Sequence, residues 1–394
     1  MNIDNQQLAQ TAFSALRAGD FKTARDGLEK IVASGNAGVS HCLGLAFSCA
    51  QMGDLASALL AVDKALELEP RNLRAILSKA DFLQGQENLE PALKHYRYAL
   101  KLAEDLETIP NDIQQGLIRA QRMCDGKADE YQEFITEKLK AGGFSPTQGN
   151  RRFQQALELC FGGKKIYYQQ PHRFYYPGLP QIQFYEREQF DWIEAIEAKT
   201  DQIRSELLAV INDREKFSPY VKSSKDNLGQ NNQGLEDNDD WSAMYLWDEG
   251  HLVAENADLF PQTLKALSSA PMPEITNQAP MSLFSKLAAN SKIPPHNGLL
   301  NTRLICHLPI IVPENCGALR VGNEERPWEE GKMLIFDDSI EHEAWNSSAN
   351  DRVILLFEIW RPEIDEQERQ LITTMLKAVK EYQNTQKAKI ATFR

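Results

Sequence analysis

The sequence lacks several features that would place it in other protein classes. No apolar run approaches the roughly 20 residues that cross a bilayer, and the first residues lack the basic region and apolar stretch of a secretory signal. Cysteine is scarce: six residues are scattered with no CxxC pair, which argues against a zinc ribbon or a disulfide framework and fits a reducing cytosol. Basic residues are outnumbered, with 43 Lys and Arg against 56 Asp and Glu and a net charge of -13, which disfavours nonspecific nucleic-acid binding. We expect a soluble, acidic, cytoplasmic protein with no membrane span and no nucleic-acid partner.

The chain of 394 residues is long enough for two or three domains, and its N-terminal part is repetitive. The residues that recur every 34 positions are Ala12, Ala46 and Ala80, then Ala24, Ala58 and Ala92, and the pairs Gly19-Asp20, Gly53-Asp54 and Glu87-Asn88. Apolar residues between them follow helical spacing, so each unit is expected to form two helices that meet at the Gly-Asp turn. This period resembles the tetratricopeptide repeat and covers roughly residues 5–106.

Arrays of this kind usually form a concave groove that resembles peptide-binding surfaces, which implies a protein or peptide partner. Two alternatives stay open: the array serves docking or dimerisation, or it merely packs on the next domain. A polar helical segment from Ile109 to about Lys140 is expected to cap the array. Together these segments predict a helical domain over residues 1–141.

The middle of the chain is predicted to be a connector over residues 142–212. Gly142-Gly143-Phe144-Ser145-Pro146 breaks the helical pattern at its start. A short amphipathic helix is expected over residues 151–159 and a longer one over 190–210, separated by an aromatic, proline-rich strip. His172 lies in this strip with no partner at ligand spacing, so it is interpreted as structural.

The last part of the chain, residues 213–394, changes to a β-like pattern and ends in a helix. It begins with a polar segment over residues 223–240 that is expected to be a surface loop. Short β-like runs then occur at residues 243–246, 282–287, 303–308, 332–336 and 353–359, separated by Gly, Pro and Asn turns. Many short strands at this spacing predict a sandwich or jelly roll. The fold class expected for the whole chain is therefore multidomain α+β, a helical repeat solenoid followed by a double-stranded β-helix.

Two histidines in this β-rich part, His296 and His342, lie 46 residues apart and can converge on a metal inside such a barrel. Non-haem Fe(II) oxygenases usually add a carboxylate two residues after the first histidine, but Gly298 occupies that position here. From spacing alone, two lone histidines are more often core or surface residues than ligands. Arg352 strengthens the metal hypothesis, because a guanidinium can hold a carboxylate cosubstrate in a bidentate manner.

The surrounding motifs resemble the aspartyl/asparaginyl β-hydroxylase family. They are Pro295-His296-Asn297-Gly298, Asn301-Thr302-Arg303-Leu304, His307-Leu308, Trp328-Glu329-Glu330-Gly331-Lys332, Phe336-Asp337-Asp338-Ser339, Glu341-His342-Glu343 and Arg352. The resemblance runs from about Trp241 to Pro362. It implies an Fe(II)- and 2-oxoglutarate-dependent dioxygenase that uses O2, with only two histidine ligands and glycine in place of the carboxylate.

The resemblance also implies roles for six residues. His296 and His342 match the iron ligands, Arg352 the arginine that pairs with the distal carboxylate of 2-oxoglutarate, Ser285 the serine beside it, His307 a residue near the other end of the cosubstrate, and Trp241 a tryptophan that lines the pocket. The other motif residues Trp328 and Asp337-Asp338 are interpreted as strand packing and turn structure, and His251 has no partner in sequence.

One departure from the family concerns the substrate. The animal members carry an arginine two residues before the histidine that His307 matches, and this chain has Ile305 there. The acidic run at residues 236–240 also lacks the basic residue expected for gripping an aspartyl side chain. The predicted function is hydroxylation of an aspartyl- or asparaginyl-type residue in a protein or peptide. The alternatives are hydroxylation of a small molecule or lipid, and a non-catalytic repeat scaffold with an inactive jelly roll.

Overall fold

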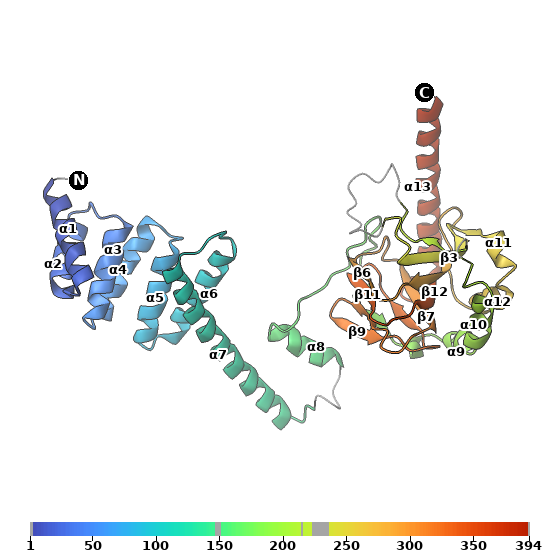
Figure 1. Cartoon of the computed structure of the whole chain (residues 1–394), viewed down its shortest axis with the longest axis horizontal. Coiled ribbons are helices and arrows are strands. Elements are labelled where there is room, and N and C mark those ends of the chain that lie inside the picture. The colour runs from blue at the N-terminus through green and yellow to red at the C-terminus, as the bar shows by residue number, and fades with distance from the viewer. Residues whose placement is uncertain (1–2, 146–150, 214–215, 223–235, 393–394) are drawn as a thin grey trace. The chain divides into compact units, whose positions relative to one another are not determined.

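The computed structural model describes residues 3–145, 151–213, 216–222 and 236–392. The chain forms two compact units, residues 1–161 and 162–394, which are described separately (Figure 1). The division falls inside the segment 142–212 predicted as a connector. Its first helix therefore belongs to the N-terminal unit, and its aromatic strip and remaining helices belong to the C-terminal unit. Within the described residues, no helix is both long enough and apolar enough to cross a bilayer.

The N-terminal unit consists of three helix pairs followed by two further helices. The pairs are α1 (Ile3–Ala18) with α2 (Phe21–Ala33), α3 (Val39–Gln51) with α4 (Leu55–Leu68), and α5 (Leu73–Gly85) with α6 (Leu89–Glu104). α7 (Asn111–Ala141) follows as the predicted capping segment, and α8 is Arg151–Cys160. All six recurring alanines are buried, which lets the paired helices approach closely. The predicted two-helix units are thereby confirmed.

The recurring Gly-Asp pairs explain the turns between the paired helices. Gly19 and Gly53 have φ values of 80° and 79°, a left-handed conformation that glycine adopts without steric cost. The next residues, Asp20 and Asp54, then cap α2 and α4 by accepting a hydrogen bond from a backbone N–H three residues on. In the third pair Glu87 takes the left-handed position with φ 61°.

The C-terminal unit contains two sheets, in which all strand pairings are antiparallel (Figure 1). The larger sheet has the order β1 (Phe184–Tyr185), β10 (Leu334–Phe336), β7 (Arg303–Ile311), β12 (Arg352–Trp360), β5 (Ser282–Leu287), β3 (Trp241–Asp248) and β2 (Ser218–Pro219), with β4 (His251–Leu252) beside β3. The smaller sheet has the order β6 (Ser291–His296), β11 (His342–Asn346), β8 (Ala318–Val321) and β9 (Glu324–Pro327). The predicted sheet-rich C-terminal part is confirmed.

Two hydrophobic clusters fix the positions of these sheets. One cluster joins their facing sides, with Leu283 and Ile354 from the larger sheet and Leu319 from the smaller one. The other covers the outer face of the larger sheet with α9 (Ile193–Glu197), α10 (Thr200–Leu208) and α12 (Pro261–Leu267). The larger sheet is thus buried on both faces, and every residue of β12 is buried.

The single helix predicted over residues 190–210 is wrong, because the structure divides it into α9 and α10. Thr200 Oγ1 donates to the Glu197 carbonyl at 2.7 Å, which ends α9 and starts α10. The C-terminal helix is confirmed as α13 (Glu366–Thr392), which packs through Ile372 and Leu376 near Trp360. Most of the predicted polar loop, residues 223–235, lies outside the described residues.

Candidate active site

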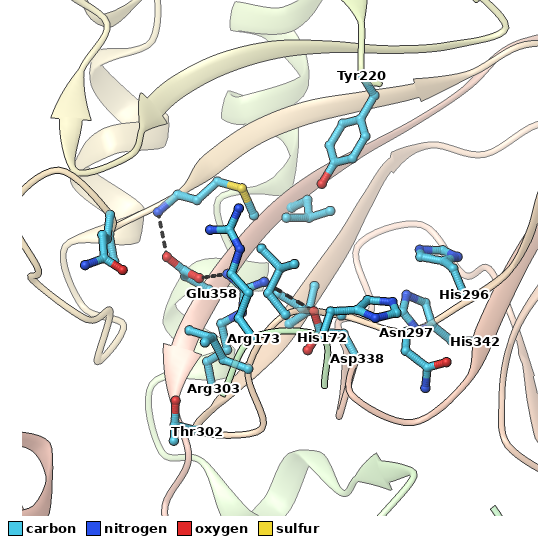
Figure 2. Close-up of a pocket in the computed structure, with 18 of the residues that line it drawn as sticks. His172, Arg173, Tyr220, His296, Asn297, Thr302, Arg303, Asp338, His342 and Glu358 are labelled. Carbon is cyan, nitrogen blue, oxygen red and sulfur yellow. Dashed lines mark hydrogen bonds and ion pairs between the residues drawn. The ribbon is translucent and has the colours of Figure 1, made fainter. Parts of the chain in front are cut away.

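A cavity of about 1380 Å³ is lined by residues from both sheets of the C-terminal unit (Figure 2). All six residues named from the sequence line it: Trp241, Ser285, His296, His307, His342 and Arg352. Strand periodicity accounts for much of the lining. Alternate residues of β7 and β12 point to the same face of the larger sheet, and those that line the cavity are Arg303, Ile305, His307, Arg352, Ile354, Leu356, Glu358 and Trp360.

His296 and His342 lie opposite each other on two neighbouring strands of the smaller sheet. His296 ends β6, His342 begins β11, and the two residues are register partners with ring centroids 4.1 Å apart. Each Nδ1 donates to the backbone carbonyl two residues earlier, at 2.8 Å to Pro294 and 3.0 Å to Ile340. Burial lowers the pKa of both imidazoles, and for His342 the neighbouring His296 lowers it further. Both rings are therefore neutral, and each Nε2 carries a free lone pair.

Gly298 lies against the carboxylate of Asp338. A Cβ at position 298 would lie 2.0 Å from Asp338 Oδ2, well inside contact distance. The Gly298 N–H also donates to the Asp338 carbonyl at 2.6 Å. The space in which a side chain at position 298 would begin is thus filled. Among the described residues no group of three His, Cys, Asp or Glu side chains is placed to hold a metal ion, which leaves the histidine pair.

Arg352 is fully buried, and none of its three guanidinium nitrogens has a hydrogen-bond partner among the described residues. Its guanidinium carbon lies 4.5 Å from the centre of the Trp328 ring. Burial lowers the pKa of Arg352 to about 10, so the group stays charged near pH 7. A buried cation without a partner is costly, and a carboxylate ligand would supply the missing acceptors.

Ser285, Trp241 and His307 line the same cavity as this guanidinium. Ser285 faces the same cavity, and its Oγ accepts from Trp241 Nε1 at 3.1 Å, so the hydroxyl hydrogen is left to donate. His307 Nδ1 is buried with no partner in the described part of the chain. Burial and the nearby Arg352 hold the pKa of His307 well below its usual range. Neutral donors and this cation thus line one cavity.

Sequence reasoning missed several lining residues. Asp337 confirms the structural interpretation, since it forms a fully buried ion pair with Arg361 at 2.7 Å. Its neighbour Asp338 instead lines the cavity, where burial raises its pKa to about 6. Asp338 thus lies in a turn, as interpreted, and its role in the cavity lining was missed. Arg303 and Glu358 were also missed, although they lie at even spacing from His307 and Arg352 on predicted strands and that periodicity could have found them.

The structure also shows where three further ring-bearing residues lie, one tyrosine and two histidines. Tyr220 stacks on Trp241 at 4.1 Å, and its hydroxyl points toward the other lining side chains (Figure 2). His172, interpreted as structural, does anchor the strip because its N–H donates to the Gly298 carbonyl at 3.0 Å. Its side chain nevertheless lines the cavity. His251 is exposed and hydrogen-bonded to Asn277 outside the cavity lining.

Comparison with known proteins places this region. Residues 197–362 match the family model described as aspartyl/asparaginyl beta-hydroxylase. This region belongs to the aspartyl/asparaginyl β-hydroxylase family. All six residues named from the sequence lie within the matched β-hydroxylase region.

Several relatives match about half of the chain. Human aspartyl/asparaginyl beta-hydroxylase is 32% identical over 178 residues, which cover 45% of this chain and 22% of that protein. Human aspartate beta-hydroxylase domain-containing protein 2 is 30% identical over 209 residues, 52% of this chain and 54% of that protein. The ornithine lipid ester-linked acyl 2-hydroxylase of Rhizobium tropici is 32% identical over 180 residues, 45% of this chain and 60% of that protein. The chain thus spans from about a fifth to three fifths of these relatives.

Solved tetratricopeptide-repeat structures match other parts of the chain. They include the Arabidopsis OM64 TPR domain, at 14% identity, 30% of this chain, 94% of that chain and a TM-score of 0.26, and the Sgt2 TPR domain from Aspergillus fumigatus, at 13% identity, 38% of this chain, 89% of that chain and a TM-score of 0.27. The repeat assignment rests on the three helix pairs themselves.

The contact between Gly298 and Asp338 makes a prediction about stability. Gly298→Ala should lower the free energy of unfolding of the C-terminal unit by about 1–3 kcal/mol, because its methyl group overlaps the carboxylate. All six tryptophans lie in residues 162–394, so tryptophan fluorescence during urea unfolding reports on this unit. Gly126→Ala, at an open position of α7, is the matched control and should leave this transition unchanged. Equal midpoints for both variants would contradict the overlap.

Proposed function

We propose that the chain is an Fe(II)- and 2-oxoglutarate-dependent hydroxylase whose two facing sheets form a double-stranded β-helix. The observation that carries this proposal is the guanidinium of Arg352, which is buried in the cavity that also contains the histidine pair and has no hydrogen-bond partner among the residues that the structure describes. A permanent cation in that position fits a dianionic cosubstrate. The histidine pair fits a divalent transition metal, because both rings are neutral with Nε2 free.

The residues present divide into holding, orienting and shielding roles. His296 and His342 would hold the iron, and their Nδ1 hydrogen bonds to Pro294 and Ile340 fix the ring orientation and the tautomer. Bound iron, 2-oxoglutarate and O2 would supply the oxidation of an unactivated C–H bond, with release of succinate and CO2.

Arg352 would bind the distal carboxylate of 2-oxoglutarate as a two-pronged donor, and Ser285 would donate to the same group. His307 has an unsatisfied Nδ1 available at the same end of the cavity. Trp241, held by Ser285 and stacked on Tyr220, closes the wall and excludes water. The missing carboxylate at Gly298 leaves the metal with two protein ligands.

The substrate has two candidate classes. The family name favours an aspartyl or asparaginyl residue in a protein or peptide. The Rhizobium relative, named for an acyl 2-hydroxylase, favours a lipid, and apolar residues of α13 such as Met375 and Val379 line the cavity and suit a chain. A non-catalytic jelly roll is the remaining alternative. It is opposed by the charged Arg352, whose buried guanidinium nitrogens find no hydrogen-bond partner in the part of the chain that the structure describes.

The iron assignment predicts the effect of losing either ligand. His296→Ala and His342→Ala should each abolish tight Fe(II) binding, measured by anaerobic calorimetry, and also succinate release from 2-oxoglutarate. With two protein ligands, neither loss is masked by the other. His251→Ala removes an exposed imidazole outside the cavity and should behave as wild type. Wild-type iron affinity in the His296→Ala or the His342→Ala variant would show that the substituted histidine is not an iron ligand.

The cosubstrate assignment predicts a separable effect at Arg352. Removing one partner of a buried charge pair costs about 2–5 kcal/mol, so Arg352→Ala should raise the half-saturating 2-oxoglutarate concentration at least ~30-fold. Iron affinity should stay nearly unchanged. Arg352→Lys should recover only part of the loss, because an ammonium lacks the planar fork. Equal loss of iron and 2-oxoglutarate binding would make Arg352 a structural residue.

We propose that the repeat unit holds a protein or peptide partner. A fragment that lacks the repeats tests this proposal. Residues 162–394 form a compact unit, so this fragment should fold, bind iron and turn over 2-oxoglutarate slowly without substrate. It should lose efficient turnover of a protein substrate, because a bound partner raises the local concentration of its target residue. Full turnover by the fragment would assign the repeats to localisation or dimerisation.

A further inference from the structure

The aromatic strip contacts the segments next to both histidines of the pair. The first loop, residues 297–302, follows His296 at the end of β6, and the second loop, residues 337–341, precedes His342 at the start of β11. Residues 169–176 of the strip bind both loops. The positions of the two proposed metal ligands are thus tied to a segment that contains neither of them.

Backbone contacts join the strip to the second loop. Gln170 N–H donates to the Ser339 carbonyl at 2.7 Å, and Gln169 forms an antiparallel bridge with Ile340. The Ile340 carbonyl is the acceptor for His342 Nδ1, a bond that fixes the orientation and the tautomer of that ring. The strip therefore holds the residue whose carbonyl orients one proposed ligand.

Backbone contacts also join the strip to the first loop. His172 N–H donates to the Gly298 carbonyl at 3.0 Å, and His172 is drawn beside the histidine pair in Figure 2. Arg173 N–H donates to the Leu299 carbonyl at the same distance of 3.0 Å. The two loops contact each other directly as well, because Gly298 N–H donates to the Asp338 carbonyl. The strip is thus a second connection between the loops, in addition to their direct contact.

One side chain of the strip, Gln169, reaches both loops at once. It is 7% exposed. Its Nε2 donates to Asp337 Oδ2 in the second loop at 2.6 Å, and its Oε1 accepts from Asn301 Nδ2 in the first loop at 3.0 Å. Nε2 also donates to the Pro180 carbonyl at 3.1 Å. Neither a carboxylate nor an ammonium could make this set of bonds, because it requires a donor and an acceptor on one group.

Asp337 connects Gln169 to the backbone of the second loop. Its Oδ2 also pairs with Arg361 at 2.7 Å, and its Oδ1 accepts from the N–H and the hydroxyl of Ser339, at 3.0 and 2.6 Å. The side chains of Asp337 and Arg361 are both fully buried. A buried carboxylate with this many donors is held firmly in place. The amide of Gln169 is therefore anchored to a rigid part of the loop that leads to His342.

The ladder of the smaller sheet holds the histidine pair less firmly than it holds residues inside the sheet. His296 is the last residue of β6 and His342 the first of β11, and the register of the two strands shifts between His342 and Ala344. An irregularity of this kind locally disrupts strand pairing. Ligands have to be held within about 0.5 Å of the binding geometry before an ion arrives. A pair at the end of an irregular ladder needs support from outside the sheet to meet that condition.

We propose that residues 169–176 are a positioning element of the proposed metal site, with Gln169 as its central positioning residue. By holding both loops, the strip fixes the separation of His296 and His342 in the metal-free chain, so that the pair is ready for a divalent ion. Gln169 acts through the two loops and does not touch the ion. The inference rests on the proposed hydroxylase function. The family model matches residues 197–362, so the strip lies outside the matched region.

The metal affinity of two matched variants tests the proposal. Gln169→Met keeps the side-chain length and removes its hydrogen bonds. Asn256→Leu makes the same change at a buried amide of α11 (Ala254–Ala257), outside the cavity lining. Fe(II) binding to the full chain is measured by anaerobic calorimetry, and stability by urea unfolding. Gln169→Met should bind Fe(II) at least ~10-fold more weakly, whereas Asn256→Leu should lose stability and keep wild-type affinity.

Two results of this comparison would overturn the proposal. Wild-type Fe(II) affinity in folded Gln169→Met would show that the amide does not position the histidine pair. Equal weakening of Fe(II) binding in Gln169→Met and Asn256→Leu would make the effect one of general stability.

A second measurement uses the unsubstituted chain. If the strip positions the pair, a metal ion bound to the pair must stabilise the strip in return, because coupling between two sites is reciprocal. Hydrogen–deuterium exchange is measured with and without Zn(II), which is redox-inert. Exchange over residues 169–174 should slow at least ~5-fold with Zn(II), and His342→Ala should abolish the slowing. Residues 186–190, a turn outside the cavity lining, should exchange at the same rate in both conditions.

The outcomes separate this inference from the proposed function. Unchanged exchange in the strip while the wild-type chain binds metal overturns the inference and leaves the iron assignment intact. A wild-type chain that binds no metal refutes the iron assignment and the inference with it. If Gln169→Met fails to fold, the exchange of the wild-type chain still decides whether the strip and the histidine pair are coupled.

Discussion

The rest of the candidate site depends on one constraint, the burial of the Arg352 guanidinium without a hydrogen-bond partner among the described residues. A buried cation without acceptors destabilises the folded chain by several kcal/mol, so the surrounding structure has to hold it in place. Arg352 begins β12, a strand paired on both sides with β5 and β7 and covered on both faces. The Trp328 ring gives the cation a favourable stacking contact, which is weaker than an ion pair. A stable sheet thus keeps the Arg352 cation buried in the cavity. A bound dianion would offset the destabilisation that this buried charge causes.

The histidine pair depends on a different constraint, the register of the smaller sheet. His296 and His342 face each other because β6 and β11 pair at those two residues. A slip of one residue would turn one imidazole to the other face of the sheet. The structure thus divides the proposed chemistry between two sheets. The larger one holds the anion-binding residues and the smaller one holds the metal-binding pair, and the hydrophobic cluster between them sets their separation.

Sequence reasoning recovered the larger sheet better than the smaller one, for a physical reason. The strands β7 and β12 contain long apolar runs, because the larger sheet is buried on both faces. The smaller sheet includes β6, which contains Pro294-Pro295, and β9, which is largely charged, so neither matches a strand pattern. All six residues named from the motif resemblance nevertheless line the cavity. Asp338 was missed because adjacent aspartates in a turn look alike in sequence, while one is paired inside the core and the other faces the cavity.

The close approach of Gly298 to Asp338 also limits how such a site can change over evolutionary time. Other Fe(II) oxygenases usually provide a carboxylate two residues after the first histidine, and here that route starts in space already filled by Asp338. A mutation at position 298 alone meets a steric barrier, and a mutation at 338 alone removes a charge from the cavity wall. A chain with this geometry would have to change both positions together, so a two-histidine site of this kind is an isolated solution that single mutations do not easily convert.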